Sequence, residues 1–161
     1  MNHHTAPLVL FALLAAAALT ARADRLPVPN HPLYQEECGS CHLAYPPQLL
    51  DAHSWLHVMN GLDKHFGSDA SLDDKRRAAI SDFLGRNAGG RKTGITADAK
   101  GEPLLRISDT AYFKRKHREV DATVWKRPSI KSPANCAACH TRAGEGDWSE
   151  RSVTIDRKSV V

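Results

Sequence analysis

Cys38-Gly39-Ser40-Cys41-His42 stands in the first third of the chain, and the same pattern returns as Cys136-Ala137-Ala138-Cys139-His140. C-x-x-C-H is the attachment signature of c-type haem. Two thiols at this spacing reach the two vinyl groups of a porphyrin, and the adjacent histidine supplies one axial nitrogen to the iron. We therefore predict two covalent haem c groups. The attaching thiols are those of Cys38, Cys41, Cys136 and Cys139, and the axial nitrogens come from His42 and His140.

The two motifs contain all four cysteines of the chain. Four cysteines of an exported protein can instead form two disulfides. A zinc ribbon needs its two pairs roughly 15–20 residues apart, whereas these pairs lie in opposite halves of the chain. A thioredoxin-like pair lies in a βαβ setting, and no such pattern surrounds either motif. None of these alternatives explains a histidine directly after both pairs, so haem attachment is the better interpretation.

Residues 1–23 have the character of an export signal. The apolar run from Leu8 to Leu19 is too short to span a bilayer, which needs about 20 residues. Ala21-Arg22-Ala23 matches the small-residue cleavage pattern of a secretory peptide. The alternative is an uncleaved anchor. We predict a cleaved signal peptide, a mature chain without a membrane span, and a periplasmic location, where bacteria attach c-type haem.

The composition indicates that the cofactors form part of the core. The 161 residues include only three Trp, three Tyr and four Phe, which give a thin polypeptide core. Two porphyrins would add a large apolar surface to it. The formal net charge is +4, and it falls by one when Arg22 is removed with the expected signal peptide. Each ferric haem with its two propionates brings about −1, so the holoprotein is close to neutral and its charge gives no argument for nucleic-acid binding.

The spacing of apolar residues and helix breakers predicts a mostly α fold with a high loop content. The expected helix N-caps are Ser71 for the third helix and Ser108 or Asp109 for the fourth. The alternation in residues 153–155 is typical of a short strand or of a tail packed on a haem edge. Helices are expected over residues 34–42, 48–61, 71–86 and 110–120.

The boundary between two parts of the chain is indicated by a segment of linker composition, not by an internal repeat. Residues 87–94 are rich in glycine and polar residues, which is typical of a connection. We therefore predict a first haem-bearing lobe over residues 24–86 and a second over residues 95–161. The two lobes of this c-type cytochrome are expected to share a haem-containing core.

The function depends on the second axial ligand of each iron. Apart from the initiating residue, Met59 is the only methionine, so at most one haem can have His/Met ligation. His117 is the only spare histidine of the second half, and it follows the aromatic pair Tyr112-Phe113. His53 and His57 share a helical face, a spacing that can also bind a metal ion. For the first haem, four candidates remain open: His65, His57, His53 and Met59.

Four stretches of the chain carry a resemblance to a known family. They are Tyr34-Gln35-Glu36-Glu37-Cys38-Gly39-Ser40-Cys41-His42, Ser54-Trp55, His65-Phe66-Gly67-Ser68-Asp69-Ala70-Ser71-Leu72, and Ser132-Pro133-Ala134-Asn135-Cys136-Ala137-Ala138-Cys139-His140. These stretches resemble the bacterial dihaem cytochrome c family.

That resemblance implies a small periplasmic electron carrier with two low-spin, bis-histidine haems. It also implies two redox partners, a high-spin monohaem cytochrome c and a membrane cytochrome b. Carried over by motif, the second axial ligands are His65 and His117. The pairing of these two histidines with particular haems stays open.

Two classes of function remain in competition. If both irons have two protein ligands, neither can bind a substrate, and the haems only change oxidation state. The alternative is a small dihaem oxidoreductase, peroxidase-like or acting on a sulfur compound, with one open iron. Dihaem peroxidases are usually about twice this length, and haem enzymes of sulfur oxidation often use a cysteine ligand that this chain lacks. We therefore predict an electron-transfer protein rather than an enzyme, with other redox proteins as partners.

Overall fold

A computed structural model describes residues 26–90 and 100–154 of the chain. Within these ranges the protein consists of α helices, short 3₁₀ turns and loops, with isolated bridges in place of strands. The prediction of a mostly α fold with a high loop content is confirmed. The expected signal peptide and residues 91–94 of the expected linker lie outside the described residues, and the division into two lobes stays a prediction.

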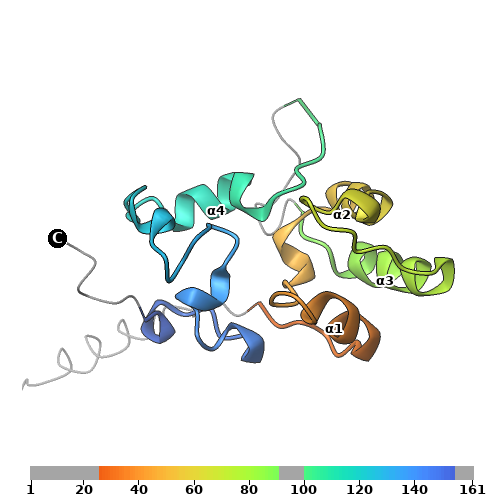
Figure 1. Cartoon of the computed structure of the whole chain (residues 1–161), viewed down its shortest axis with the longest axis horizontal. Coiled ribbons are helices and arrows are strands. Elements are labelled where there is room, and N and C mark those ends of the chain that lie inside the picture. The colour runs from red at the N-terminus through yellow and green to blue at the C-terminus, as the bar shows by residue number, and fades with distance from the viewer. Residues whose placement is uncertain (1–25, 91–99, 155–161) are drawn as a thin grey trace, which may run out of the picture.

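Three α helices form the packed part of the N-terminal half, and they lie together in Figure 1. They are α1 (Pro32–Gly39), α2 (Ala52–Asn60) and α3 (Asp74–Asn87). α3 packs against both α1 and α2. Each of the three begins after a residue whose side chain accepts a hydrogen bond from a backbone N–H of the first turn. These capping residues are His31, Asp51 and Asp73.

The N-cap of α3 differs from the sequence prediction. Ser71 does not cap the helix and lies in a turn before it, where its N–H donates to the Asp69 carboxylate 2.9 Å away. Asp73 caps the helix instead and accepts a 2.9 Å hydrogen bond from the N–H of Arg76. α1 also ends earlier than expected, at Gly39, so that the end of the first motif lies in a loop.

The core of the described structure is an apolar cluster among α1, α2 and α3. Leu104 and Ile107, from the C-terminal half, pack against the same cluster. The buried hydroxyl of Ser54 accepts a 2.9 Å hydrogen bond from the N–H of Leu104, which ties that segment to α2. The buried members of the cluster are Tyr34, Ala44, Leu50, Trp55, Met59, Ile80, Phe83 and Leu84.

In residues 100–154 the structure has one short α helix, α4 (Ala111–Lys116), which lies apart from α1 and α3 in Figure 1. Its N-cap is Thr110, whose hydroxyl accepts a 3.1 Å hydrogen bond from the N–H of Phe113. The helix was expected to reach residue 120. It ends at Lys116 because the next residue, His117, leaves the helical conformation while its N–H still bonds to the Phe113 carbonyl.

Short 3₁₀ turns and loops connect these helices. Val153, expected in a short strand or in a tail on a haem edge, forms an isolated antiparallel bridge with His140, and residue 155 lies outside the described part. In the described ranges, no helix has the length and apolar character needed to cross a membrane. The turns cover Pro47–Leu49, Leu62–Lys64, Ile107–Asp109, Val124–Lys126, Cys136–Ala138, Ala143–Glu145 and Glu150–Ser152.

Candidate haem-binding sites

The first Cys-x-x-Cys-His motif lies at the C-terminal end of α1. Cys38 belongs to the last turn of the helix, and Cys41 and His42 follow in the loop. The Nδ1 of His42 lies 2.7 Å from the carbonyl oxygen of Leu43. A carbonyl can only accept, so this nitrogen carries the proton in the hydrogen bond. The other nitrogen, Nε2, is then the one with a lone pair available to a metal.

His65 lies across from His42 in a tight turn after Leu62–Lys64. The carbonyl of His65 accepts a 3.0 Å hydrogen bond from the N–H of Ser68, which closes the turn. The two residues inside it, Phe66 and Gly67, have positive φ values of 50° and 97°. Glycine adopts this conformation without strain, whereas it is uncommon for phenylalanine. The turn presents the His65 ring to the His42 ring, and the two ring centres are 6.2 Å apart.

The second motif is built on a 3₁₀ turn instead of an α helix. The turn covers Cys136–Ala138, and the N–H of His140 donates to the carbonyl of Cys136 over 2.8 Å. His117 approaches from the end of α4, where its Nδ1 donates to the Phe113 carbonyl over 2.9 Å. The rings of His117 and His140 have centres 6.1 Å apart.

Both histidine pairs have the spacing of two ligands on opposite sides of one metal ion. A metal–imidazole bond is about 2 Å long, and the ring centre lies about 1 Å beyond the nitrogen, so the expected separation of the ring centres is about 6 Å. The observed separations are 6.2 Å and 6.1 Å. The angle between the ring planes is 22° in the first pair and 82° in the second.

The electrostatic environment keeps one ring of each pair neutral. Burial lowers the pKa of His65, and the neighbouring His42 lowers it further. Burial likewise lowers the pKa of His140, with a smaller contribution from His117. A lowered pKa favours the neutral imidazole, which is the form that binds a metal.

The four cysteines all lie in the described part of the chain, and none of them forms a disulfide there. Burial raises the pKa of Cys38 to about 11 and that of Cys136 to about 11. These two thiols are therefore protonated at neutral pH. A catalytic or redox-active cysteine has a lowered pKa, so neither Cys38 nor Cys136 has the environment of a nucleophile.

Comparison with known proteins gives a family for this arrangement. The family model described as dihaem cytochrome c matches residues 34–148, which include both motifs and both histidine pairs. The chain belongs to the dihaem cytochrome c family. Two haem c groups are therefore the cofactors of this dihaem cytochrome. Membership of the family supports a role as a haem-based electron carrier.

Solved structures of dihaem cytochromes are similar over most of the chain. A diheme cytochrome c from Rhodobacter sphaeroides is 41% identical, with a TM-score of 0.67 over 75% of this chain and 98% of that one. A crystal structure of DHC purified from the same organism is 43% identical, with a TM-score of 0.63, covering 76% and 100% of the two chains. The X-ray structure of a diheme cytochrome type c from Shewanella baltica OS155 is 35% identical, with a TM-score of 0.66, covering 80% and 94%. No curated protein matches the chain.

The surroundings of the second histidine pair fit a flat apolar group that carries acceptors. Phe113 stacks on His117 with ring centres 4.0 Å apart, and Trp125 and Trp148 lie near the same two histidines. Trp148 Nε1 is buried without a hydrogen-bond partner, which costs about 1–3 kcal/mol in an isolated protein. A porphyrin next to these rings would supply apolar faces for the aromatic side chains and propionate oxygens that accept hydrogen bonds.

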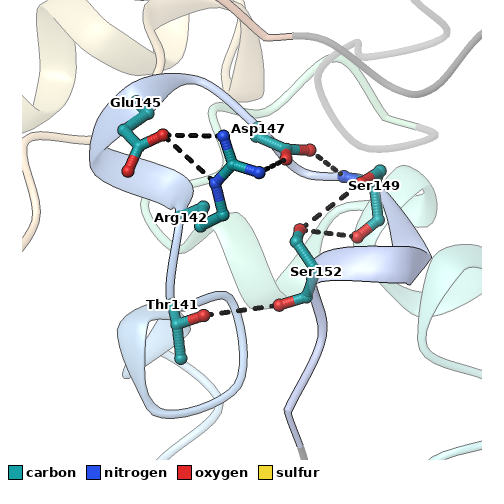
Figure 2. Close-up of polar contacts among 6 residues, drawn as sticks. All are labelled: Thr141, Arg142, Glu145, Asp147, Ser149 and Ser152. Atoms are coloured by element: carbon teal, nitrogen blue, oxygen red, sulfur yellow. Dashed lines mark hydrogen bonds and ion pairs between the residues drawn. The ribbon is translucent and has the colours of Figure 1, made fainter.

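A polar network holds the segment after His140 in place (Figure 2). Arg142 donates to the Glu145 carboxylate over 2.9 Å and forms an ion pair with Asp147. The Asp147 carboxylate also accepts a 3.0 Å hydrogen bond from the N–H of Ser149. Trp148 lies between these two residues, and its ring centre is 5.1 Å from that of His140. The network therefore positions an aromatic side chain against the motif histidine.

The other candidates for the first haem lie elsewhere. His53 and His57 contact each other on the exposed face of α2, with their Nε2 atoms 3.1 Å apart. The Met59 side chain is 2% exposed and belongs to the core cluster. Of the four residues left open by the sequence, the structure places His65 against His42.

Tyr45 is a functional candidate that the sequence analysis missed. Its ring stacks on His42 with centres 4.7 Å apart, and its hydroxyl donates a 2.7 Å hydrogen bond to the carbonyl of Ala134. Burial raises the pKa of Tyr45 to about 12, with a further contribution from Cys136, so the hydroxyl keeps its proton. Tyr45 thus joins the loop of the first motif to the approach of the second. Its position three residues after a motif histidine was the available signal, but its partner is distant in sequence.

We expect Tyr45→Phe to lower the stability of the holoprotein while leaving both haem spectra unchanged. The substitution keeps the ring on His42 and removes one hydrogen bond, a loss of about 1 kcal/mol. A loss of this size lowers Tm by a few degrees, measurable by thermal unfolding. Tyr45→Leu, which also removes the stacked ring, should lower Tm further. Equal Tm values for wild type and Tyr45→Phe would show that the contact with Ala134 contributes nothing.

Proposed function

We propose that this protein is a periplasmic electron carrier whose two haems are both six-coordinate and bis-histidine. In this proposal His42 and His65 ligate the first iron, and His117 and His140 ligate the second. Cys38 and Cys41 attach the first porphyrin, and Cys136 and Cys139 the second. The observation that carries the proposal is the equal spacing of the two histidine pairs, which matches opposite ligands on one metal ion.

The chemistry follows from the closed coordination. The haems, when bound, supply reversible one-electron exchange at iron. Four histidines occupy both axial positions of each iron in this arrangement, so no site is left for peroxide or another small substrate. The Nδ1 hydrogen bonds of His42 and His117 to the carbonyls of Leu43 and Phe113 fix the orientation of these rings and make them stronger donors to iron.

Location and partners complete the proposal. The export signal predicted for residues 1–23 and the covalent attachment of haem both support a periplasmic protein. Electrons would enter from one redox protein and leave to another. The proposed partners are those associated with the family, a high-spin monohaem cytochrome c and a membrane cytochrome b.

Spectroscopy of the purified ferric holoprotein tests the coordination. We expect two distinct low-spin EPR signals, because the angle between axial ring planes governs their anisotropy and differs greatly between the two pairs. No methionine–iron charge-transfer band should appear, and added cyanide should not bind on mixing. A high-spin signal in the wild type, with rapid binding of cyanide or peroxide, would instead favour a small dihaem oxidoreductase with one open iron.

A further inference from the structure

Two histidines outside the haem sites form a close pair on the surface. His53 and His57 are one turn apart on α2, and both are exposed. Their Nε2 atoms are 3.1 Å apart, and their ring planes are nearly perpendicular, at 86°. The pair is directed away from the core face of α2, which buries Trp55 and Met59.

The separation of the two nitrogens is that of neighbouring ligands on one metal ion. Metal–imidazole bonds are about 2.0–2.1 Å long, so two of them at a right or tetrahedral angle place their nitrogens about 3 Å apart. Histidines four residues apart on a helix lie on the same face, and zinc-binding helices use this spacing. The observed 3.1 Å is a hydrogen bond in which one ring donates its Nε2 proton to the other. A bound metal ion would displace that proton, and the spacing of the two nitrogens meets the requirement without any movement of the backbone.

The helix that carries the pair is firmly held. The Asp51 carboxylate caps α2 by accepting the N–H of Ser54 over 2.8 Å. On the buried face, the indole N–H of Trp55 donates to the carbonyl of Pro47 over 2.7 Å. These contacts fix the backbone of α2 at its N-terminus and on its buried face. Little backbone freedom is therefore lost when a ligand binds between the two histidine rings.

We propose that His53 and His57 form a surface site for a divalent transition-metal ion such as Zn²⁺ or Cu²⁺. Within residues 26–90 and 100–154 no group of three or more histidine, cysteine or acidic side chains could hold a metal ion, so the protein supplies two ligands here. Water completes the coordination, so some of the positions around the metal ion are held by exchangeable water molecules. Cu²⁺ binds more tightly than Zn²⁺ at such a nitrogen pair.

Titration of Zn²⁺ into the untagged ferric holoprotein, followed by calorimetry, tests the site. We expect one Zn²⁺ per chain in the wild type. His53→Ala and His57→Ala should each weaken binding about tenfold or more, because each removes one of two protein ligands. Asn60→Ala, an exposed substitution on the same helix, is the matched control and should bind as the wild type does. Zn²⁺ should also raise Tm in the wild type and not in the double variant.

The outcome is independent of the proposed electron carrier. The haem spectra of all these variants should match the wild type, since neither histidine belongs to the haem pairs. A Cu²⁺ EPR signal with nitrogen coupling from two imidazoles would identify the ligands directly. Unchanged Zn²⁺ affinity in the His53→Ala, His57→Ala double variant would overturn the proposal, as would the absence of stoichiometric binding to the wild type.

Discussion

We expect ferric His65→Ala to contain one high-spin and one low-spin haem, in contrast to the two low-spin haems proposed for the wild type. The substitution removes the imidazole that faces His42 at 6.2 Å, and the other histidine pair is untouched. The first haem would then have lost one of its two proposed protein ligands, and water or cyanide could bind in its place. EPR and absorbance spectra of the purified ferric variant measure the change, and cyanide should bind to one haem per chain.

His57→Ala is a matched control for this variant, because His57 lines the same small surface cavity as His65 but faces His53. It should keep both haems low-spin. Met59→Leu, which preserves the volume of a buried core residue, should also do so. If His65→Ala retained two low-spin haems, another side chain would have to ligate the first iron, and the proposed ligand set would be wrong.

We expect His117→Ala to make the second haem high-spin and leave the first low-spin. We also expect it to lower the stability of the holoprotein more than His65→Ala does. His117 is the C-cap of α4, donates from its Nδ1 to the Phe113 carbonyl, and stacks on the Phe113 ring with the ring centres 4.0 Å apart. The substitution would therefore remove a side-chain hydrogen bond and a ring contact at the end of α4 as well as a proposed iron ligand. Added imidazole should enter the space left by the side chain and return the second haem to the low-spin state.

His117→Met separates ligation from folding. A thioether ligand would restore a six-coordinate iron and raise the reduction potential of that haem relative to the wild type. A high-spin second haem that neither imidazole nor methionine restores would argue against ligation at this position. The two ligand variants also test the pairing, because His65→Ala should remove the signal of the nearly parallel ring pair, at 22°, and His117→Ala that of the nearly perpendicular pair, at 82°. Loss of the same signal in both variants would contradict the pairing of His42 with His65 and of His117 with His140.

The attachment residues could be predicted from the sequence because their chemistry is local. Two thiols and a histidine within five residues define the motif whatever the surrounding fold. The local conformation did not follow from the motif, since Cys38 lies in the last turn of an α helix and Cys136 begins a 3₁₀ turn.

The partners of the motif histidines were less accessible to sequence reasoning. Four side chains near the first motif can bind iron, and only the tertiary fold distinguishes His65 from His57. The contact of Tyr45 with Ala134 is harder still, because it joins segments 89 residues apart and leaves no periodic signal. The N-cap of α3 was predicted wrongly for a simpler reason. Ser71 and Asp73 are both favourable N-cap residues two positions apart, and their residue types alone do not decide between them.

The burial of Met59 bears on how the first haem behaves when it is reduced. Some haem proteins exchange one axial ligand for another as iron changes oxidation state, and a methionine next to a haem is a natural substitute. Here Met59 is 2% exposed and lies in the apolar cluster among α1, α2 and α3. Drawing it out would leave a cavity comparable to a Met→Ala change, at a cost of about 2–5 kcal/mol. That cost opposes ligand exchange and favours a carrier that keeps the same iron ligands in its oxidised and reduced states.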